Sequence, residues 1–287
     1  MGSLLGFIIV FVGVLGGYVM HGGDLIVLWQ VSEFIIIGGA AIGSMVAATG
    51  PRQFMHTVKD VLGIFRKNPY TRENYTRLLA TLYILISRSK KDGLTALEDD
   101  VENPETSELF ASDPFLQSND HALLFLTDTM KVVMSGAIEP HYMDQSLDLD
   151  LDRYEEEINH SPHQMQKVAD ALPAFGIVAA VLGVIITMGM IGGDAAMVGK
   201  GVAAALVGTL LGVLLGYGVA GPLASVLEER AGYKMRYLSA IKATLIAWQQ
   251  EQAPMNCVEW GRRMILPADR PSFDELDEAC SEARSRI

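Results

Sequence analysis

Two long apolar segments near the middle of the chain constrain its fold more than any other feature. They cover residues 172–192 and 202–223, and neither contains a charged side chain. Each can cross a hydrocarbon core, which needs about 20 helical residues. Two shorter apolar runs, at 4–20 and 34–49, precede them. The sequence therefore predicts an all-α, polytopic membrane protein with four transmembrane helices and a helical cytoplasmic domain.

Small residues recur on one face of each long segment. Helical periodicity groups Gly176, Ala180, Gly183 and Thr187 in the first, and Ala205, Thr209, Gly212 and Gly216 in the second. Gly208 adds two overlapping GxxxG steps, a pattern that lets helices approach closely in lipid. Ordinary helix packing accounts for these glycines. It does not account for Pro173 and Pro222.

Both prolines lie toward the predicted cytoplasmic ends of their helices. A proline inside a helix frees the carbonyl about four residues earlier, which can bind water or serve as a bend point. A plain helix end at the bilayer surface is the alternative. The interiors of the four apolar runs contain no Asp, Glu, Lys, Arg or His. An ion crossing here would therefore need a titratable group from another chain.

Basic residues indicate the orientation, because Lys and Arg near the membrane stay on the cytoplasmic side. The link at 21–31 has none, whereas they are frequent after the second and fourth spans. Both termini are therefore predicted to be cytoplasmic. Glu33 enters the outer end of the second span. An interfacial position and a place at the mouth of an ion route are both open for it.

The chain divides into four predicted parts. A transmembrane hairpin at 1–50, which Gly50 and Pro51 end, precedes a helical cytoplasmic domain at 51–170. A pore-lining pair at 171–225 and a C-terminal helix and tail at 226–287 follow, and the end of the tail is predicted to be a loosely held short helix.

A basic cluster and an acidic block stand side by side in the cytoplasmic domain. They comprise Arg88, Lys90 and Lys91, followed by Glu98, Asp99, Asp100 and Glu102. A solvated surface with partial internal pairing is one interpretation, since exposed ion pairs contribute little stability. A charged face for a partner is the other.

Several classes of function find no support in the sequence. The net charge of −12 argues against a nucleic-acid partner. Cys257 and Cys280 lack CxxC spacing and are expected to be reduced structural thiols. The acidic run at 148–159 lacks the glycine and glutamate of a calcium loop. No phosphate loop, nucleophile–base pair or dinucleotide fingerprint occurs, so neither an enzyme nor a cofactor is expected.

Five separated motifs together resemble one protein family. They are SLLGFIIVFVGVLGGYV, ALEDDVENPETSELFASDP, LPAFGIVAAVLGV, VGTLLGVLLGYGVAGPLASVL and RPSFDELDE. In this order, and over essentially the whole chain, they resemble the MotA family of bacterial flagellar motor stator subunits. The resemblance implies a ring of MotA copies around a MotB dimer in the inner membrane, where MotB supplies a membrane aspartate. It further implies that proton flow drives torque on the rotor protein FliG.

Two other functions remain as alternatives. An ExbB- or TolQ-like energiser uses a similar ion-driven ring, but such proteins have one span before the large cytoplasmic segment, whereas this chain is predicted to have two. A non-conducting membrane scaffold is the second alternative, and it predicts no effect of changing the hydroxyls or prolines of the long segments.

The resemblance also implies residues of an ion pathway. The two prolines match residues associated with ion conduction, Thr209 matches the pore threonine, and Ala180 stands where proton-driven members tend to have alanine. The predicted set is Pro173, Ala180, Thr187, Thr209, Tyr217 and Pro222.

Rotor-facing charges follow from the same resemblance. Lys90 and Glu98 match the family's torque residues. Lysine keeps the positive charge of the arginine common in the family but lacks its planar fork. Arg88 and Lys91 are therefore candidates to share the basic role.

Overall fold

The computed structural model describes residues 2–136, 139–192 and 194–284, and no strand occurs among them. The chain packs as two compact units. Met1–Lys67 and Ile158–Glu229 form one, here called the apolar unit, and Asn68–Glu157 and Arg230–Ile287 form the other, the charged unit. The all-α prediction is confirmed for the described residues.

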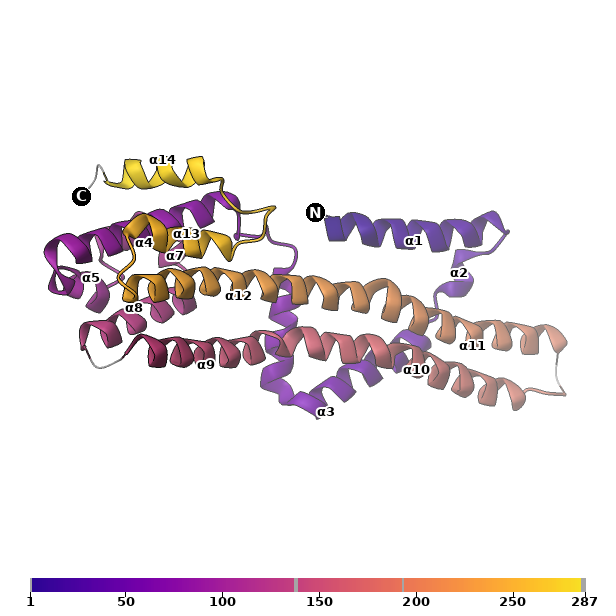
Figure 1. Cartoon of the computed structure of the whole chain (residues 1–287). Coiled ribbons are helices and arrows are strands. Elements are labelled where there is room, and N and C mark those ends of the chain that lie inside the picture. Colours follow the sequence, from indigo (N-terminus) through magenta and orange to yellow (C-terminus); the bar gives the residue numbers. More distant parts are fainter. Residues whose placement is uncertain (1, 137–138, 193, 285–287) are drawn as a thin grey trace. The chain divides into compact units, whose positions relative to one another are not determined.

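The apolar unit contains the long hydrophobic helices (Figure 1). Its elements are α1 (Gly2–Met20), α2 (Leu25–Leu28), α3 (Val31–Gly63), α10 (His160–Met188), α11 (Ala195–Leu215), a π-helical turn η2 (Gly216–Ala220) and the start of α12 (Gly221–Gln249). Helix α10 packs against both α11 and α3. The packing therefore builds a three-helix core from segments far apart in the sequence.

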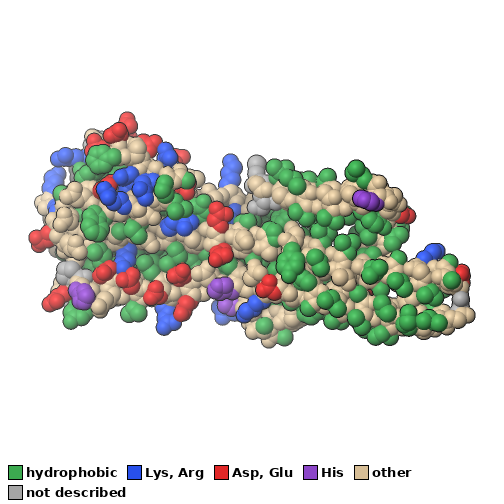
Figure 2. All heavy atoms as spheres, turned by 45° about the vertical axis from the view of Figure 1, so that its right-hand side comes forward, with side chains coloured by type: hydrophobic (Ala, Val, Ile, Leu, Met, Phe, Trp, Pro, Cys, Tyr) green, Lys and Arg blue, Asp and Glu red, His purple; other side chains and the backbone are tan. Residues whose placement is uncertain are grey.

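Three helical stretches are long and apolar enough to cross a membrane. They are Leu25–Gly63, His141–Met188 and Ala195–Gln249, and Leu4–Met20 forms a shorter apolar helix. Of the four predicted spans, the last three thus lie in helices long enough to cross a membrane, whereas the first lies in the shorter helix. Figure 2 shows hydrophobic side chains covering the outside of α10 and α11, with few charged ones. Ile177 and Ile185 of α10 and Leu206 of α11 are exposed, which suits contact with lipid.

The prediction that Gly50 and Pro51 end the hairpin was only partly right. Gly50 has φ 77° and ψ 163°, which breaks the helical path, but α3 resumes at once and continues to Gly63. Glycine adopts positive φ without steric cost, and proline needs no N–H partner in the first turn of a helix. The pair therefore makes a kink between two helical halves.

The charged unit is a bundle of shorter helices. Its elements are α4 (Arg72–Asp92), η1 (Leu94–Leu97), α5 (Glu98–Glu102), α6 (Glu108–Ala111), α7 (Pro114–Gln117), α8 (Asp120–Met134), α9 (Pro140–Ile158), the rest of α12, α13 (Pro254–Arg263) and α14 (Phe273–Arg284). Helix α4 is central to it and packs against α13 and α14.

Sequence signals determine the ends of α4. The Thr71 side chain accepts a hydrogen bond from the backbone N–H of Asn74 at the N-terminus. Gly93, with φ 86°, ends the helix after Asp92, as the predicted glycine stop requires. Between these ends, Leu78, Leu82 and other apolar residues are fully buried. The predicted helix and its buried face are confirmed.

The C-terminal helix is more firmly held than the sequence suggested. Helix α14 packs against α4 and buries Leu276 and Cys280 in the core of the charged unit. The prediction of a loosely held helix was therefore wrong, because these two side chains fall on one face of an otherwise polar segment. Cys257 and Cys280 are free thiols. Burial raises the pKa of Cys280 to about 12, which disfavours its reactive thiolate form.

Candidate functional site

Helices α10 and α11 form an antiparallel seam in which backbone meets backbone. A Cβ atom built on Gly176 would lie 2.8 Å from the Gly208 carbonyl oxygen and 2.9 Å from the Gly212 Cα. From the other side, a Cβ on Gly212 would lie 2.7 Å from the Gly176 Cα. No side chain fits in this space. The predicted close approach of the two glycine faces is confirmed.

A hydroxyl lies at one end of the same seam. The Thr187 Oγ1 donates a 2.8 Å hydrogen bond to the Gly183 carbonyl, and Thr187 is 2 % exposed. Across the seam, a Cβ on Gly201 would collide with the Thr187 side chain. The hydroxyl is thus satisfied within its own helix and packed against α11.

Pro173 lies near the other end of the seam. Proline has no N–H, so the carbonyl four residues before it, at Ala169, lacks its usual helical partner. A Cβ on Gly216 would lie 2.8 Å from this Ala169 oxygen and 2.9 Å from the Pro173 Cδ. The carbonyl freed by Pro173 therefore lies directly against Gly216, a contact that only glycine permits.

Gly216 is also the first residue of the π-helical turn. The Gly221 N–H bonds to the Gly216 carbonyl, five residues back, and Pro222 follows immediately. Such π turns inside α-helices occur frequently at functional sites. The backbone irregularities associated with the two prolines therefore meet at Gly216, although the prolines are 49 residues apart in the sequence.

The structure brings only part of the predicted ion-pathway set together. The Ala180 backbone nitrogen would lie 3.1 Å from a Cβ on Gly208, so Ala180 and the half-buried Thr209 are at one level of the seam. Thr187 faces Gly201, eight residues before Thr209 on α11, which corresponds to about 12 Å along the helix.

Two members of the predicted set lie away from the seam. Tyr217 is 66 % exposed, and Pro222 is also exposed on its helix. Tyr217 lies within the π turn and Pro222 comes after it, so neither belongs to the contact between α10 and α11.

Glu33 is a buried acid that the predicted set did not contain. It is 5 % exposed, and its Oε2 lies 2.5 Å from the position of a Cβ on Gly208. The same Cβ would lie 3.1 Å from the Ala179 Cβ. Glu33 therefore lies where α3, α10 and α11 meet, and not at an exposed interface.

One pattern in the sequence could have indicated the burial of Glu33. Glu33, Ile37, Ala41 and Met45 recur every four residues and form the buried face of α3. An acid occupies the first position of an otherwise apolar stripe. Which helix this stripe would face could not be read from α3 alone.

In the charged unit, part of the basic cluster pairs with the acidic block. The Arg88 guanidinium lies 2.9 Å from the Asp100 carboxylate, and the Ser107 hydroxyl donates a 2.6 Å hydrogen bond to the same carboxylate. Arg88 and Asp100 are only partly exposed. The predicted partial internal pairing is confirmed for this pair.

The other charges remain at the surface. The Lys90 Nζ donates to the backbone carbonyls of Glu251, at 3.1 Å, and Gln252, at 2.6 Å, so an exposed ammonium is held against the end of α12. Lys91 and Glu98 are exposed. Neither forms an ion pair within 4.0 Å with another described residue. Lys90, Lys91 and Glu98 thus present charge to solvent.

A second buried acid lies in the charged unit. Asp113 is fully buried, and its Oδ1 accepts hydrogen bonds from the N–H groups of Phe115 and Leu116, at 3.2 and 3.0 Å. Its Oδ2 has no hydrogen-bond partner among the described residues, and neither has the buried Tyr237 hydroxyl. Burial raises the pKa of Asp113 above its ordinary value of 3.8.

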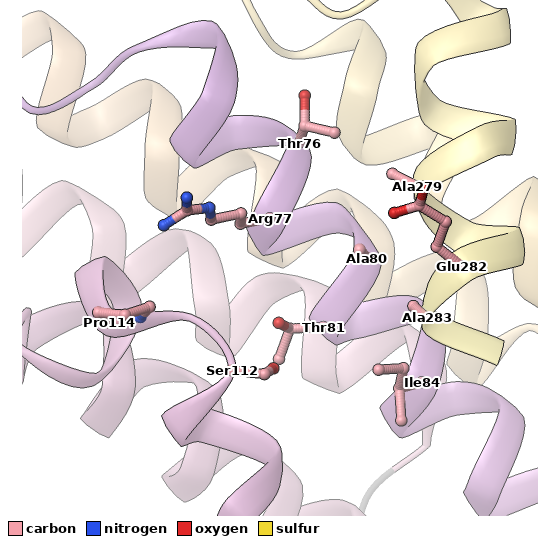
Figure 3. Close-up of a pocket in the computed structure, with 10 residues that line it drawn as sticks. All are labelled: Thr76, Arg77, Ala80, Thr81, Ile84, Ser112, Pro114, Ala279, Glu282 and Ala283. Carbon is pink, nitrogen blue, oxygen red and sulfur yellow. The ribbon is translucent and has the colours of Figure 1, made fainter. Parts of the chain in front are cut away.

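A pocket of about 420 Å³ lies between α4, α14 and the segment before α7 (Figure 3). Its polar side chains are largely engaged elsewhere. The Thr76 and Ser112 hydroxyls donate to backbone carbonyls of their own helices, and Arg77 pairs with Glu73. The pocket therefore offers few polar groups to orient a ligand.

Two family models match the chain and together cover most of it. The model described as "Motility protein A N-terminal" matches residues 4–93, which include most of α1 and all of α2, α3 and α4. The model of the MotA/TolQ/ExbB proton channel family matches residues 117–239, which include α10, α11 and the π turn. The seam therefore lies within the proton channel match.

Solved structures support the fold. The structure of C. jejuni MotAB superposes with a TM-score of 0.76 at 18% sequence identity, covering 94% of this chain and 98% of that one. The flagellar MotAB stator complex from Bacillus subtilis has a TM-score of 0.70 at 19% identity, with the same coverage. At these identities the likeness concerns the fold.

Relatives with higher identity span nearly the whole chain. Motility protein A of Salmonella typhimurium is 38% identical over 98% of this chain and 96% of its own length. Motility protein A of Escherichia coli K12 is 39% identical over 96% and 93%, respectively. The chain therefore belongs to the motility protein A family.

Proposed function

We propose that this motility protein is a stator subunit of the bacterial flagellar motor. In this proposal, copies of the chain form a ring around a MotB dimer in the inner membrane, with both termini in the cytoplasm. Proton flow along the α10–α11 wall then produces torque on the rotor protein FliG. The family membership, the apolar helices and the likeness to solved MotAB structures support this function.

The observation that carries the proposal is the composition of the seam. Its closely packed helices contain hydroxyls, glycine backbone and the freed Ala169 carbonyl, and the α10 and α11 segments at 172–188 and 202–215 contain no titratable side chain. A proton path through such a wall needs an acid from elsewhere. A membrane aspartate of MotB would supply the acceptor that α10 and α11 lack.

The π turn offers a route from ion passage to movement. Gly216 packs against Pro173 and the freed Ala169 carbonyl. It is also the first residue of the π turn that leads into α12. Helix α12 then runs without a break to Gln249 and contributes Leu238 and Leu245 to the core of the charged unit. A shift of Pro173 against Gly216 would therefore act on the first turn of this helix.

The exposed charges of the charged unit are the proposed rotor face. Lys90, Lys91 and Glu98 present their charges to solvent, whereas the Arg88 guanidinium is engaged by Asp100. We assign the rotor contact to the three exposed residues, with Lys90 held in position by the carbonyls of Glu251 and Gln252. Charges at such faces determine register and encounter rate more than affinity.

The coupling ion is tested by swimming. A strain that lacks its own copy of this gene is complemented with the chain, and swimming speed is measured in sodium-free medium with and without a protonophore. We expect normal swimming without sodium and rapid loss of swimming with the protonophore. Loss of motility in sodium-free medium would contradict the proton assignment, and failure to restore motility in any medium would contradict the stator function.

Charge reversal tests the rotor face. We expect Lys90→Glu combined with Glu98→Lys to impair swimming at a normal level of the protein in the membrane. Arg88→Ala serves as the comparison, because it breaks an internal ion pair and is expected to lower the stability of the charged unit. Full motility of the double reversal would remove both residues from the rotor contact.

A further inference from the structure

We propose that Glu33 is a proton-carrying carboxyl that this chain itself contributes to the ion route. The inference deepens the proposed function and rests on it. In this view α3 is part of the conducting wall, together with α10 and α11. Glu33 takes up a proton from the outer side and passes it on toward the acid contributed by the partner protein.

The position of Glu33 is the first support. Glu33 precedes Ile37 and Ala41 on the buried face of α3, so the fold directs its side chain toward α10 and α11 and away from lipid. Its Oε2 reaches to 2.5 Å from the Cβ position of Gly208. Thr209 follows Gly208 directly, and the Ala180 nitrogen borders the same space. The carboxyl therefore reaches the level of two residues predicted to line the ion pathway.

The space around the carboxyl is the second support. A side chain at position 208 would occupy the volume that the Glu33 carboxylate fills, and the Ala179 methyl bounds that volume on the α10 side. Glycine and alanine at these positions leave just enough room for a carboxyl group between three helices. An apolar residue at position 33 would fill the stripe of α3 equally well, so packing alone does not require an acid.

A buried carboxyl oxygen without a partner is the third support. Glu33 Oε2 has no hydrogen-bond partner among the described residues, although the atom is buried. The Ser32 side chain bonds to the Glu33 carboxyl, but the buried oxygen without a partner still makes the carboxylate costlier in free energy than the neutral acid. Acids at membrane depth commonly belong to ion or proton routes. A group that gains from binding a proton is suited to carrying one.

In the described part of the chain, no fixed counter-charge adjoins this position. The α10 segment at 172–188 has no titratable side chain, and the nearest charged residue on α11 is Lys200, eight residues before Gly208, or about 12 Å along the helix. In the α1–α2 link, His21 and Asp24 are exposed and bond to the backbone of Gly17 and Ile26. Among the residues that the structure describes, no basic side chain pairs with Glu33 to keep it permanently ionised.

The transfer itself is a simple proton exchange. The Glu33 carboxylate accepts a proton from a hydronium ion of the outer solution. One O–H bond of the hydronium ion breaks and one O–H bond to the carboxyl forms, which leaves a water molecule and a neutral carboxyl. That bond breaks when the proton moves, directly or through water, to the carboxylate of the partner protein. Glu33 is then a carboxylate again, and no other reactant is consumed.

The test uses the complete chain, expressed with its natural partner in a strain lacking its own copy of the gene. Rotation speed at low load and the number of working stators are measured on single motors at several external pH values. Glu33→Gln keeps the shape of the side chain but cannot carry a proton, and Glu33→Asp keeps the acid. Asp24→Asn is the matched control, because it removes an exposed carboxylate from the preceding link and asparagine can still cap α2.

We expect Glu33→Gln to join the motor normally and to lower the proton flow per stator, measured as low-load speed, by about tenfold or more. The dependence of speed on external pH should flatten. Glu33→Asp should recover part of the speed, and Asp24→Asn should match the wild type.

Two outcomes would overturn the inference. In one, Glu33→Gln joins the motor and rotates at wild-type speed at every external pH. In the other, Glu33→Gln reduces only the number of stators while each keeps its normal speed, which would make Glu33 a structural residue. A wild-type chain that fails to drive rotation would instead refute the proposed stator function, so the two failures are distinguishable.

Discussion

Substitution of Gly212 by alanine tests the close approach of the α10 and α11 backbones. The added methyl carbon would lie 2.7 Å from both the Gly176 Cα and the Leu172 carbonyl oxygen, and 3.0 Å from the Gly176 nitrogen. Carbon atoms in good contact lie about 3.5–4.0 Å apart, so α10 and α11 would have to separate locally by about 1 Å. All three neighbours are backbone atoms, which cannot rotate away as a side chain can.

The expected cost follows from this geometry. Overpacking of this kind typically costs about 1–3 kcal/mol, and alanine regains up to about 1 kcal/mol of helix propensity. A net loss of about 1–2 kcal/mol in the free energy of unfolding is therefore expected. Since 1 kcal/mol corresponds to roughly 2–4 °C in domains of 150–250 residues, the midpoint of thermal unfolding should fall by about 5 °C.

Gly199→Ala is the matched control for this experiment. Gly199 lies on the same helix, but a Cβ there would meet nothing within 4 Å. The Gly199→Ala protein should unfold at the wild-type temperature or slightly above it. Both variants are purified in the same detergent, their unfolding is followed by circular dichroism, and swimming is scored in the complemented strain. Equal midpoints for Gly212→Ala and Gly199→Ala would refute the close approach of α10 and α11.

Three further predictions concern the charged unit. Burial raises the pKa of Asp113, so the stability that its protonated form contributes is lost as pH rises from 3.8 through the raised pKa. Asp113→Asn should therefore flatten the dependence of the unfolding free energy on pH and be at least as stable as the wild type at pH 7. Parallel pH profiles for the two proteins would contradict the buried acid. Lys90 bonds to two carbonyls after the end of α12, so Lys90→Met should lower the free energy of unfolding by about 0.5–1 kcal/mol. Lys91→Met should change it little. Equal midpoints of chemical denaturation for the two variants would exclude this capping role of Lys90. Cys280 is buried, and its pKa is raised to about 12. A thiol reagent should therefore modify it only as fast as the charged unit opens. Labelling at the rate of a free thiol in solution would contradict the burial of Cys280.

Much of the site could be derived from local patterns. The glycine faces of α10 and α11 follow from helical periodicity and from the need of membrane helices for close contact. The start and end of α4 follow from Thr71 and Gly93, because caps and positive φ angles depend on neighbouring residues. Those signals lie within a few residues of the structure they specify.

Contacts between distant segments could not be derived in this way. The sequence places Lys90 beside an acidic block, but the fold gives it the carbonyls of Glu251 and Gln252, about 160 residues away. The sequence does not show what the carbonyl freed by Pro173 contacts, whereas the fold places this carbonyl against Gly216. Which atoms meet depends on the rotation and register of packed helices, and no single segment encodes either quantity.

Glu33 shows this division most clearly. The sequence by itself determined that an acid stands at the end of an apolar helix, and that α10 and α11 are free of charge with small residues on one face. Only the tertiary structure decided that this acid is buried, because its burial requires Gly208, Ala179 and the stripe of α3 to converge on one point. Hydropathy is a property of each residue, whereas the burial of a carboxyl is a property of three helices packed together.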